Sequence, residues 1–308
     1  MEWSDEVDDV IGGDAAAGVA YLTPAKGVVI TPMSPLGLRD RERGTVTITT
    51  SLGLWKKLAR IRDNPGVAIA FHAREHGFSS RPDFVLVQGR ARIQDRPDRE
   101  WLESITPQWE RFLGRRERGS IGRLMRVYYW ERVGVEVTVE RILRWDGPRC
   151  EGEFELFGAP FPDEPPPQRE PGKGIGPRVD CARAAQEAAR LPHVLLGWNG
   201  RDDLPAVVAA RAVDAGEEGV RLVSDSGMIP PGGRRAGLVA HAFAARMQGQ
   251  EQRIYTGWMR SGGGSEALYA PHTRAGSRLP ESRVLFDVGA GVLTRLGIRG
   301  AREAGLAA

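Results

Sequence analysis

Short runs of apolar and β-branched residues, separated by turn residues, dominate the first half of the chain. GVAYLTP and VVITPM flank a Lys26-Gly27 turn, which is typical of a β-hairpin. Residues 46–50 alternate as a half-buried strand does, and GVAIAFH, DFVLVQGRARIQD and ERVGVEVTVERILRWDG have the composition of further strands. Helical spacing occurs at residues 2–17, after Ser51, and at 97–118 with an interruption before Pro107. This order predicts a small antiparallel barrel with helices at its corners.

The second half follows the same order of elements. Residues 159–179, APFPDEPPPQREPGKGIGPRV, are dense in proline and glycine and predict a linker between domains 1–158 and 180–308. Beyond it, VDCARAAQEAARLPHVLLGW, PAVVAARAV, VRLVSDSG, GLVAHAF and QRIYTGWMR match the helix and strands of the first half. The closing segments align at a constant offset of 283 − 132 = 151, which pairs Arg132, Val133, Glu136, Val137 and Arg144 with Arg283, Val284, Asp287, Val288 and Arg295. We therefore expect an internal duplication that ends in matching strands.

Composition narrows the class of protein. A chain of 308 residues suits two domains, and a net charge of +3 from 43 basic and 40 acidic side chains is too balanced for a dedicated nucleic-acid binder. The N-terminus is acidic and no apolar run approaches about 20 residues, so we expect a soluble cytoplasmic protein without a membrane partner. The only cysteines, Cys150 and Cys181, lie on either side of the linker, and no zinc-type spacing occurs. No disulfide framework and no metal site are expected.

One stretch, residues 47–72 (TITTSLGLWKKLARIRDNPGVAIAFH), carries the clearest chemical signal. A strand ends in hydroxyl side chains and a short helix with two lysines follows; we call the segment 49–57 the cradle. Hydroxyls, backbone N–H groups at a helix start and fixed cations are what a phosphate needs. The alternative is a Ser-capped surface helix with solvated lysines, and spacing alone favours it. The second half has MIPPGGRRAG at this place, where two prolines and two glycines exclude a helix, so the cradle does not repeat.

Four segments together, GVAYLTPAKGVVITPM, VTITTSLGLWKKLARIRDNPGVAIAFH, PDFVLVQGRARI and VGVEVTVERILRW, resemble the pyridoxamine 5'-phosphate oxidase-like family of flavin and deazaflavin proteins. The resemblance implies a mainly β (α+β) protein with peripheral helices, built from two tandem split β-barrels that form a pseudo-dimer within one chain. It also implies FMN or coenzyme F-420 as the cofactor. The residues that it assigns to the cofactor phosphate are Thr49, Thr50, Ser51, Lys56 and Lys57, and those along the ring are Thr31, Pro32 and Met33.

The sequence leaves the roles of two further pairs of residues open. Arg234 and Arg235 follow a Pro-Gly turn; they could meet an anionic ligand or the cofactor tail, or belong to a rigid exposed turn. His72 and His241 occupy matching positions in the two halves. Proton transfer or haem ligation would use such a pair, but symmetric core packing after duplication is the favoured interpretation.

The function expected from these features is that of an oxidoreductase that passes a hydride or electrons from FMN or F-420 to a small organic substrate. The flavin would carry the chemistry, so the sequence identifies no catalytic residue. Two alternatives stay open: a non-catalytic flavin- or haem-binding module, and a cofactor-free structural or interaction protein on the same fold. Whether the pseudo-dimer pairs again into a homodimer is also open.

Overall fold

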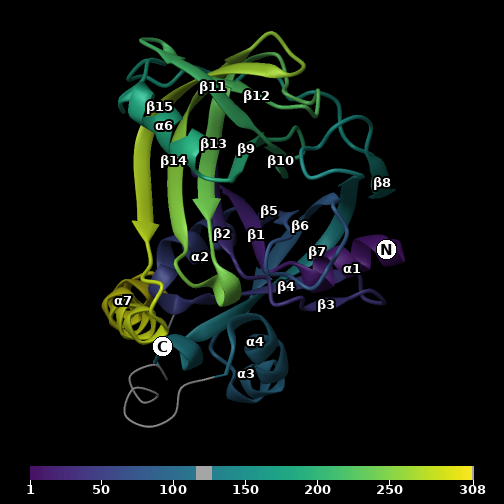
Figure 1. Cartoon of the computed structure of the whole chain (residues 1–308), viewed down its shortest axis with the longest axis vertical. Coiled ribbons are helices and arrows are strands. Elements are labelled where there is room, and N and C mark those ends of the chain that lie inside the picture. Colours follow the sequence, from purple (N-terminus) through teal and green to yellow (C-terminus); the bar gives the residue numbers. More distant parts are fainter. Residues whose placement is uncertain (116–126, 307–308) are drawn as a thin grey trace.

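Two antiparallel sheets form the frame of the molecule, and the computed structural model describes residues 1–115 and 127–306 (Figure 1). The strands of the first sheet are ordered β2-β1-β5-β6-β7-β4-β3, with β8 paired to β7. They span β1 (Ala16–Leu22), β2 (Val28–Met33), β3 (Arg39–Asp40), β4 (Thr45–Ser51), β5 (Gly66–Ala73), β6 (Phe84–Ile93), β7 (Arg132–Trp145) and β8 (Glu155–Gly158). The predicted hairpin is confirmed, since β1 pairs with β2 across the Lys26-Gly27 turn.

The second sheet repeats this order strand for strand, as β10-β9-β13-β14-β15-β12-β11. Its strands are β9 (His193–Asn199), β10 (Pro205–Ala209), β11 (Arg211–Gly216), β12 (Gly219–Val223), β13 (Gly232–Ala242), β14 (Glu251–Ser261) and β15 (Glu266–Arg278). Even the irregularities agree, because the β6–β7 ladder shifts register at Gln88/Gly89 and the β14–β15 ladder at Thr256/Gly257. The duplication and the two-barrel architecture are therefore confirmed.

The alignment of the closing segments at an offset of 151 is wrong. Arg283, Val284, Asp287, Val288 and Arg295 do not form a strand, because they lie in helix α7 (Arg283–Glu303). The counterpart of β7 is β15, which already fills the place between β14 and β12 and leaves no position there for another strand. The paired bulges set the true offset at 271 − 139 = 132, from the pairs Gly89↔Val139 and Gly257↔Pro271.

Helices cover the corners of the barrels. Helix α1 (Asp5–Gly13) begins at Ser4, whose hydroxyl accepts a hydrogen bond from the Val7 N–H; it is shorter than expected because β1 starts at Ala16. The remaining helical elements are η1 (Leu52–Leu54), α2 (Trp55–Asp63), α3 (Arg99–Ser104), α4 (Thr106–Leu113), α6 (Cys181–Arg190) and η2 (Ala245–Met247). The break between α3 and α4 confirms the interruption predicted before Pro107, while the predicted end at 116–118 lies outside the described residues. No helix in the described part of the chain is long and apolar enough to span a membrane.

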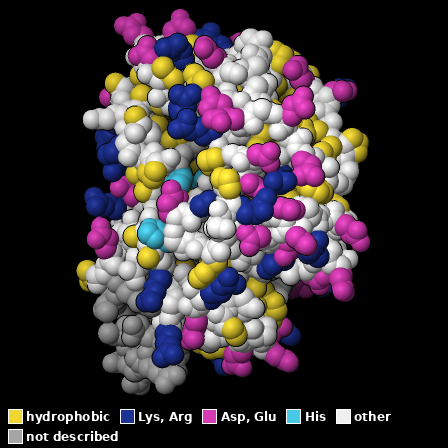
Figure 2. All heavy atoms as spheres, turned by 45° about the vertical axis from the view of Figure 1, so that its right-hand side comes forward, with side chains coloured by type: hydrophobic (Ala, Val, Ile, Leu, Met, Phe, Trp, Pro, Cys, Tyr) yellow, Lys and Arg dark blue, Asp and Glu magenta, His cyan; other side chains and the backbone are white. Residues whose placement is uncertain are grey.

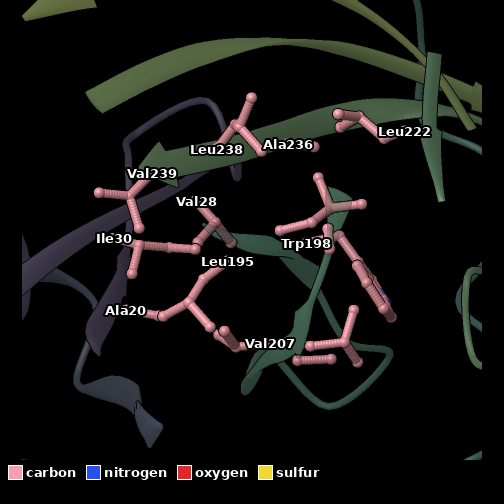
Figure 3. Packing of buried hydrophobic residues seen from close by; sticks show 14 of the residues in the cluster. Ala20, Val28, Ile30, Leu195, Trp198, Val207, Leu222, Ala236, Leu238 and Val239 are labelled. Atoms are coloured by element: carbon pink, nitrogen blue, oxygen red, sulfur yellow. The ribbon is translucent and has the colours of Figure 1, made fainter. Parts of the chain in front are cut away.

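The two barrels share a hydrophobic core. Side chains of β1 and β2 pack directly against those of β9 and β10, as Figure 3 shows for Ala20, Val28 and Ile30 beside Leu195 and Val207. Each large side chain buried there contributes about 1.5–3 kcal/mol. At Gly237 the backbones meet so closely that a Cβ would lie 2.4 Å from the Val28 carbonyl oxygen, which only glycine allows. The halves therefore associate as the subunits of a dimer do, within one chain.

Candidate functional site

The cradle begins where β4 ends. Ser51 is extended (φ −70°, ψ 140°), and its Oγ accepts a hydrogen bond from the Gly53 N–H, so it caps η1, the single turn that leads into α2. The prediction that Ser51 caps the helical segment after the strand is confirmed, with a short 3-10 turn inserted first.

The two lysines of α2 have different environments. Lys57 is buried with Leu58 and Ile61, at 7% exposure, and its Nζ lies 3.9 Å from the Met33 Sδ. Lys56 is exposed, and its Nζ lies 5.6 Å from the centroid of the Trp55 ring. The solvated-lysine interpretation therefore describes Lys56, whereas Lys57 points into the protein beside the end of β2.

Lys57 has no carboxylate partner among the described residues. Burial, followed by the positive charge of Arg132, lowers the pKa of Lys57 to about 7. Arg132 is itself buried; its guanidinium donates to the Thr49 Oγ1 at 3.0 Å and lies 4.9 Å from the centroids of the Trp109 and Tyr128 rings. Two cations thus share a buried corner in which the described chain places no anion.

The hydroxyl group of Thr50, at the end of the same strand as Ser51, has no partner among the described residues. The Oγ1 of Thr50 is buried without a hydrogen-bond partner, although a buried hydroxyl normally has one. Thr49, Ser51, Lys57 and Arg132 offer hydroxyls and positive charge in this corner, and Thr50, the residue between the two other hydroxyls, remains a predicted contact. Such a donor set fits a phosphate group better than a metal ion, which would need lone pairs rather than cations.

Helix α7 of the second half covers the cradle. The Thr294 Oγ1 lies 3.0 Å from the Ser51 Oγ, and both residues are buried. Glycines allow this approach: a Cβ on Gly53 would lie 2.7 Å from the Thr294 Cα, and one on Gly297 would lie 2.2 Å from the Gly53 carbonyl oxygen. Figure 1 shows α7 beside α2. The second half therefore supplies one wall of the site.

The residues expected along the cofactor ring lie next to the cradle. Thr31 is half-buried and its hydroxyl donates to the Val19 carbonyl at 3.5 Å, while the Pro32 carbonyl accepts from the Gln250 Nε2 at 3.1 Å. Met33 touches Lys57, as described above. The structure thus brings Met33 against the cradle residue Lys57, with Thr31 and Pro32 next to it along β2, and Gln250 contacts Pro32 from the other barrel.

Arg234 and Arg235 are not brought to this corner. Both lie in β13, where Arg234 donates to the carbonyls of Pro165 and Pro231, and Arg235 donates to the Arg169 carbonyl. These contacts hold the linker. Arg235 also lies against Gly27, at the opposite end of β2 from Met33, and six residues of strand span about 20 Å.

Sequence reasoning missed Arg132 and Thr294 as parts of the site. Arg132 opens β7 and is the register partner of Ser51, so a correct pairing of β4 with β7 would have identified it. Thr294 carries no such signal, because it lies 243 residues from Ser51 in a segment that was expected to be a strand.

The histidine pair lies on the seam between the barrels. The Nε2 atoms of His72 and His241 are 2.8 Å apart, and the His72 Nδ1 lies 2.9 Å from the Ala70 carbonyl oxygen. Because a carbonyl only accepts, His72 carries its proton on Nδ1 and receives a hydrogen bond from His241. Burial lowers the pKa of His72 to about 3, so the pair is neutral. No group of three or more His, Cys, Asp or Glu side chains in the described part of the chain could hold a metal ion.

Comparisons with known proteins give the following neighbours. No family model and no curated protein matches the chain. Among solved structures, a conserved hypothetical protein from Mycobacterium tuberculosis is 20% identical with a TM-score of 0.36, over 47% of this chain and 86% of its own. A protein related to general stress protein 26, of the pyridoxinephosphate oxidase family, from Clostridium acetobutylicum is 13% identical (TM-score 0.33; 47% and 85% coverage). An F-420 reductase is 15% identical (TM-score 0.33; 44% and 94%). Each neighbour therefore corresponds to about half of this chain.

Proposed function

We propose that the cradle binds the phosphate of a flavin-type cofactor and that the protein is an oxidoreductase acting on a small organic substrate. The observation that carries this proposal is the pair of buried cations, Lys57 and Arg132, which lack an anion among the described residues. An unpaired buried charge costs several kcal/mol, and a bound phosphate would remove that cost by ion pairing and hydrogen bonding.

Each residue of the site has a part in holding the cofactor. Ser51 and Thr50 would donate hydroxyl hydrogen bonds to phosphate oxygens, and Lys57 would supply the positive charge, with Arg132 behind Thr49 holding that threonine in place. Thr31, Pro32 and Met33 would present a strand edge to the ring system. The cofactor, when bound, supplies the hydride or electron chemistry, while this chain supplies binding and orientation.

The charge of the site favours FMN over coenzyme F-420. FMN ends in a phosphate monoester, which carries close to two negative charges at neutral pH, whereas the phosphodiester of F-420 carries one. Two buried cations match the monoester. FMN is therefore our first choice of cofactor and F-420 the second.

The test is an equilibrium titration of the full chain with FMN and with F-420, followed by absorption and fluorescence. We expect Lys57→Met to weaken FMN binding by about 10- to 100-fold, the loss of a hydrogen-bonded charge pair. Lys56→Met is the matched control, because it removes the same charge from the exposed neighbour on α2 and should leave the affinity within about twofold.

Two results would contradict the proposal: no saturable binding of either cofactor, or equal effects of the two lysine substitutions. Steady-state turnover of the loaded protein with reductants and with nitro or enone acceptors separates an enzyme from a flavin-binding module. Tight FMN binding without turnover would favour the module.

A further inference from the structure

A cavity of about 500 Å³ opens between the barrels, away from the cradle. Residues at the end of β5 and the segments around 81 and 148 line one side, and residues of β9 and the ends of β10 and β12 line the other. Its volume lies within the range of small-molecule sites, which occur preferentially at domain interfaces. Figure 2 shows histidine side chains reaching the surface midway along the molecule, next to acidic, basic and hydrophobic ones.

Strand register identifies this cavity as the counterpart of the cradle in the second barrel. In the first sheet, Gly18 pairs with both Pro32 and Ala70; in the second, Leu195 pairs with both Ala209 and Val239. Pro32 therefore corresponds to Ala209, and Met33 to Ala210. Both alanines line the cavity.

The register of β4, the strand that ends in Ser51, leads to the same correspondence. Val46 pairs with Val137 of β7, and Val220 pairs with Tyr269 of β15, at the offset of 269 − 137 = 132 that the bulges establish. Five residues further on, Ser51 therefore corresponds to Asp225, which also lines the cavity. The second barrel therefore has a cavity at the place that corresponds to the cradle.

The chemistry of this second site differs from that of the cradle. Asp225, in place of the capping serine, has no hydroxyl to donate to a phosphate, and the Pro-Gly segment 230–233 has no lysine to correspond with Lys57. Asp225 is held by Arg211, with Oδ1 and Nη2 3.0 Å apart. Alanines in place of Pro32 and Met33 widen the cavity on the side where a ring would lie.

One arginine on the wall is free to meet a ligand. Arg149 is exposed and has no ion-pair partner among the described residues. Arg74, in contrast, pairs with Asp14 and donates from its Nε to the Arg81 carbonyl. Glu75 is likewise engaged by the His193 Nε2 at 3.1 Å. Pro82, Pro148 and Pro192 provide flat apolar walls. Guanidinium groups bind planar carboxylates through paired hydrogen bonds.

We propose that this cavity is a second ligand site, distinct from the cradle, that binds a small organic carboxylate with a flat apolar body. The proposal does not rest on the flavin function, because the groups that line the cavity are separate from the cradle residues. The fused duplication would then hold one phosphate site and one carboxylate site in equivalent places.

The experiment is an isothermal titration of the full chain with sodium benzoate, and separately with inorganic phosphate. We expect saturable benzoate binding with one site per chain. Ala210→Met, which restores the side chain found at the equivalent position of the first barrel, should weaken it more than tenfold by filling the cavity. Arg149→Gln should weaken it about tenfold. Arg201→Gln, which removes an exposed arginine elsewhere, should leave it unchanged.

The outcomes are distinguishable from those of the flavin proposal. Far-UV circular dichroism and urea unfolding show whether Ala210→Met is folded, without any need for FMN binding, and Lys57→Met should bind benzoate as wild type does. The inference is overturned if benzoate does not saturate, if Ala210→Met binds it normally, or if Lys57→Met loses it. Phosphate binding at this cavity as tightly as benzoate would also overturn it, since the site would then be one for simple anions.

Discussion

Lys57 makes the stability of the cofactor-free protein depend on pH in a particular direction. Its pKa is about 7 in the folded protein and 10.5 in an unfolded chain. Between these values the unfolded state binds more protons, so the free energy of unfolding rises with pH from 7 to 10.5; below pH 7 the full penalty is present. The two pKa values give an increase of about 2 kcal/mol between pH 7 and pH 9.

Urea unfolding at pH 7 and pH 9, in phosphate-free buffer, measures this increase. Lys57→Met should abolish it, while the exposed control Lys56→Met should keep it; other titrating groups cancel in the difference between variants. Saturating FMN should also reduce the increase, because a bound phosphate favours the charged lysine. The reasoning is refuted if wild type and Lys57→Met differ in their pH dependence by less than about 0.5 kcal/mol, near the uncertainty of the extrapolation.

Further predictions concern the cover of the cradle and the seam between the barrels. Gly297→Ala should lower stability by about 1–3 kcal/mol and weaken FMN binding, because its Cβ would meet the Gly53 carbonyl oxygen at 2.2 Å. Gly289→Ala, in the same helix with no atom within 4 Å of its Cβ, should stabilise by up to about 1 kcal/mol; equal effects of the two changes in chemical denaturation would rule out the close packing of α7. The pKa of His72 is about 3 in the folded protein and 6.5 in the unfolded chain, so the unfolded state binds the proton more readily. The free energy of unfolding should therefore fall as the pH drops below 6.5, and His72 accounts for a loss of about 2 kcal/mol at pH 5. Replacing both His72 and His241 with Leu should reduce the loss of unfolding free energy between pH 7.5 and acid pH. An equal loss in the double variant and in wild type would contradict a neutral buried pair.

The sequence predicts the local elements well where the pattern is regular. The β1–β2 hairpin, the strand into Ser51 and the helix ended by Asn64-Pro65 follow from alternation, capping and proline chemistry. The cradle could be located, but not the difference between Lys56 and Lys57, since the direction of each side chain depends on packing against Met33 and β2. Because Lys56 and Lys57 are neighbours in the sequence, both are predicted to contact the phosphate.

Contacts between distant parts of the chain could not be predicted from the sequence, for physical reasons. The closing segments share arginine and valine spacing by coincidence, and nothing local shows that β15 already occupies the sheet. Arg234 and Arg235 have guanidinium groups that could bind an anion, but these groups donate hydrogen bonds to carbonyls of the linker instead. Thr294 reaches the cradle only through the tertiary placement of α7.

Fusion of the two barrels changes what one substitution can do. In a symmetric homodimer a replacement at the capping serine would alter two sites at once, because both subunits are copies of one gene product. In this chain the equivalent positions, Ser51 and Asp225, are encoded separately, so one copy can accept a carboxylate while the other keeps its hydroxyl. Selection can thus act on each half alone, while the hydrophobic core that the two barrels share keeps them packed against each other.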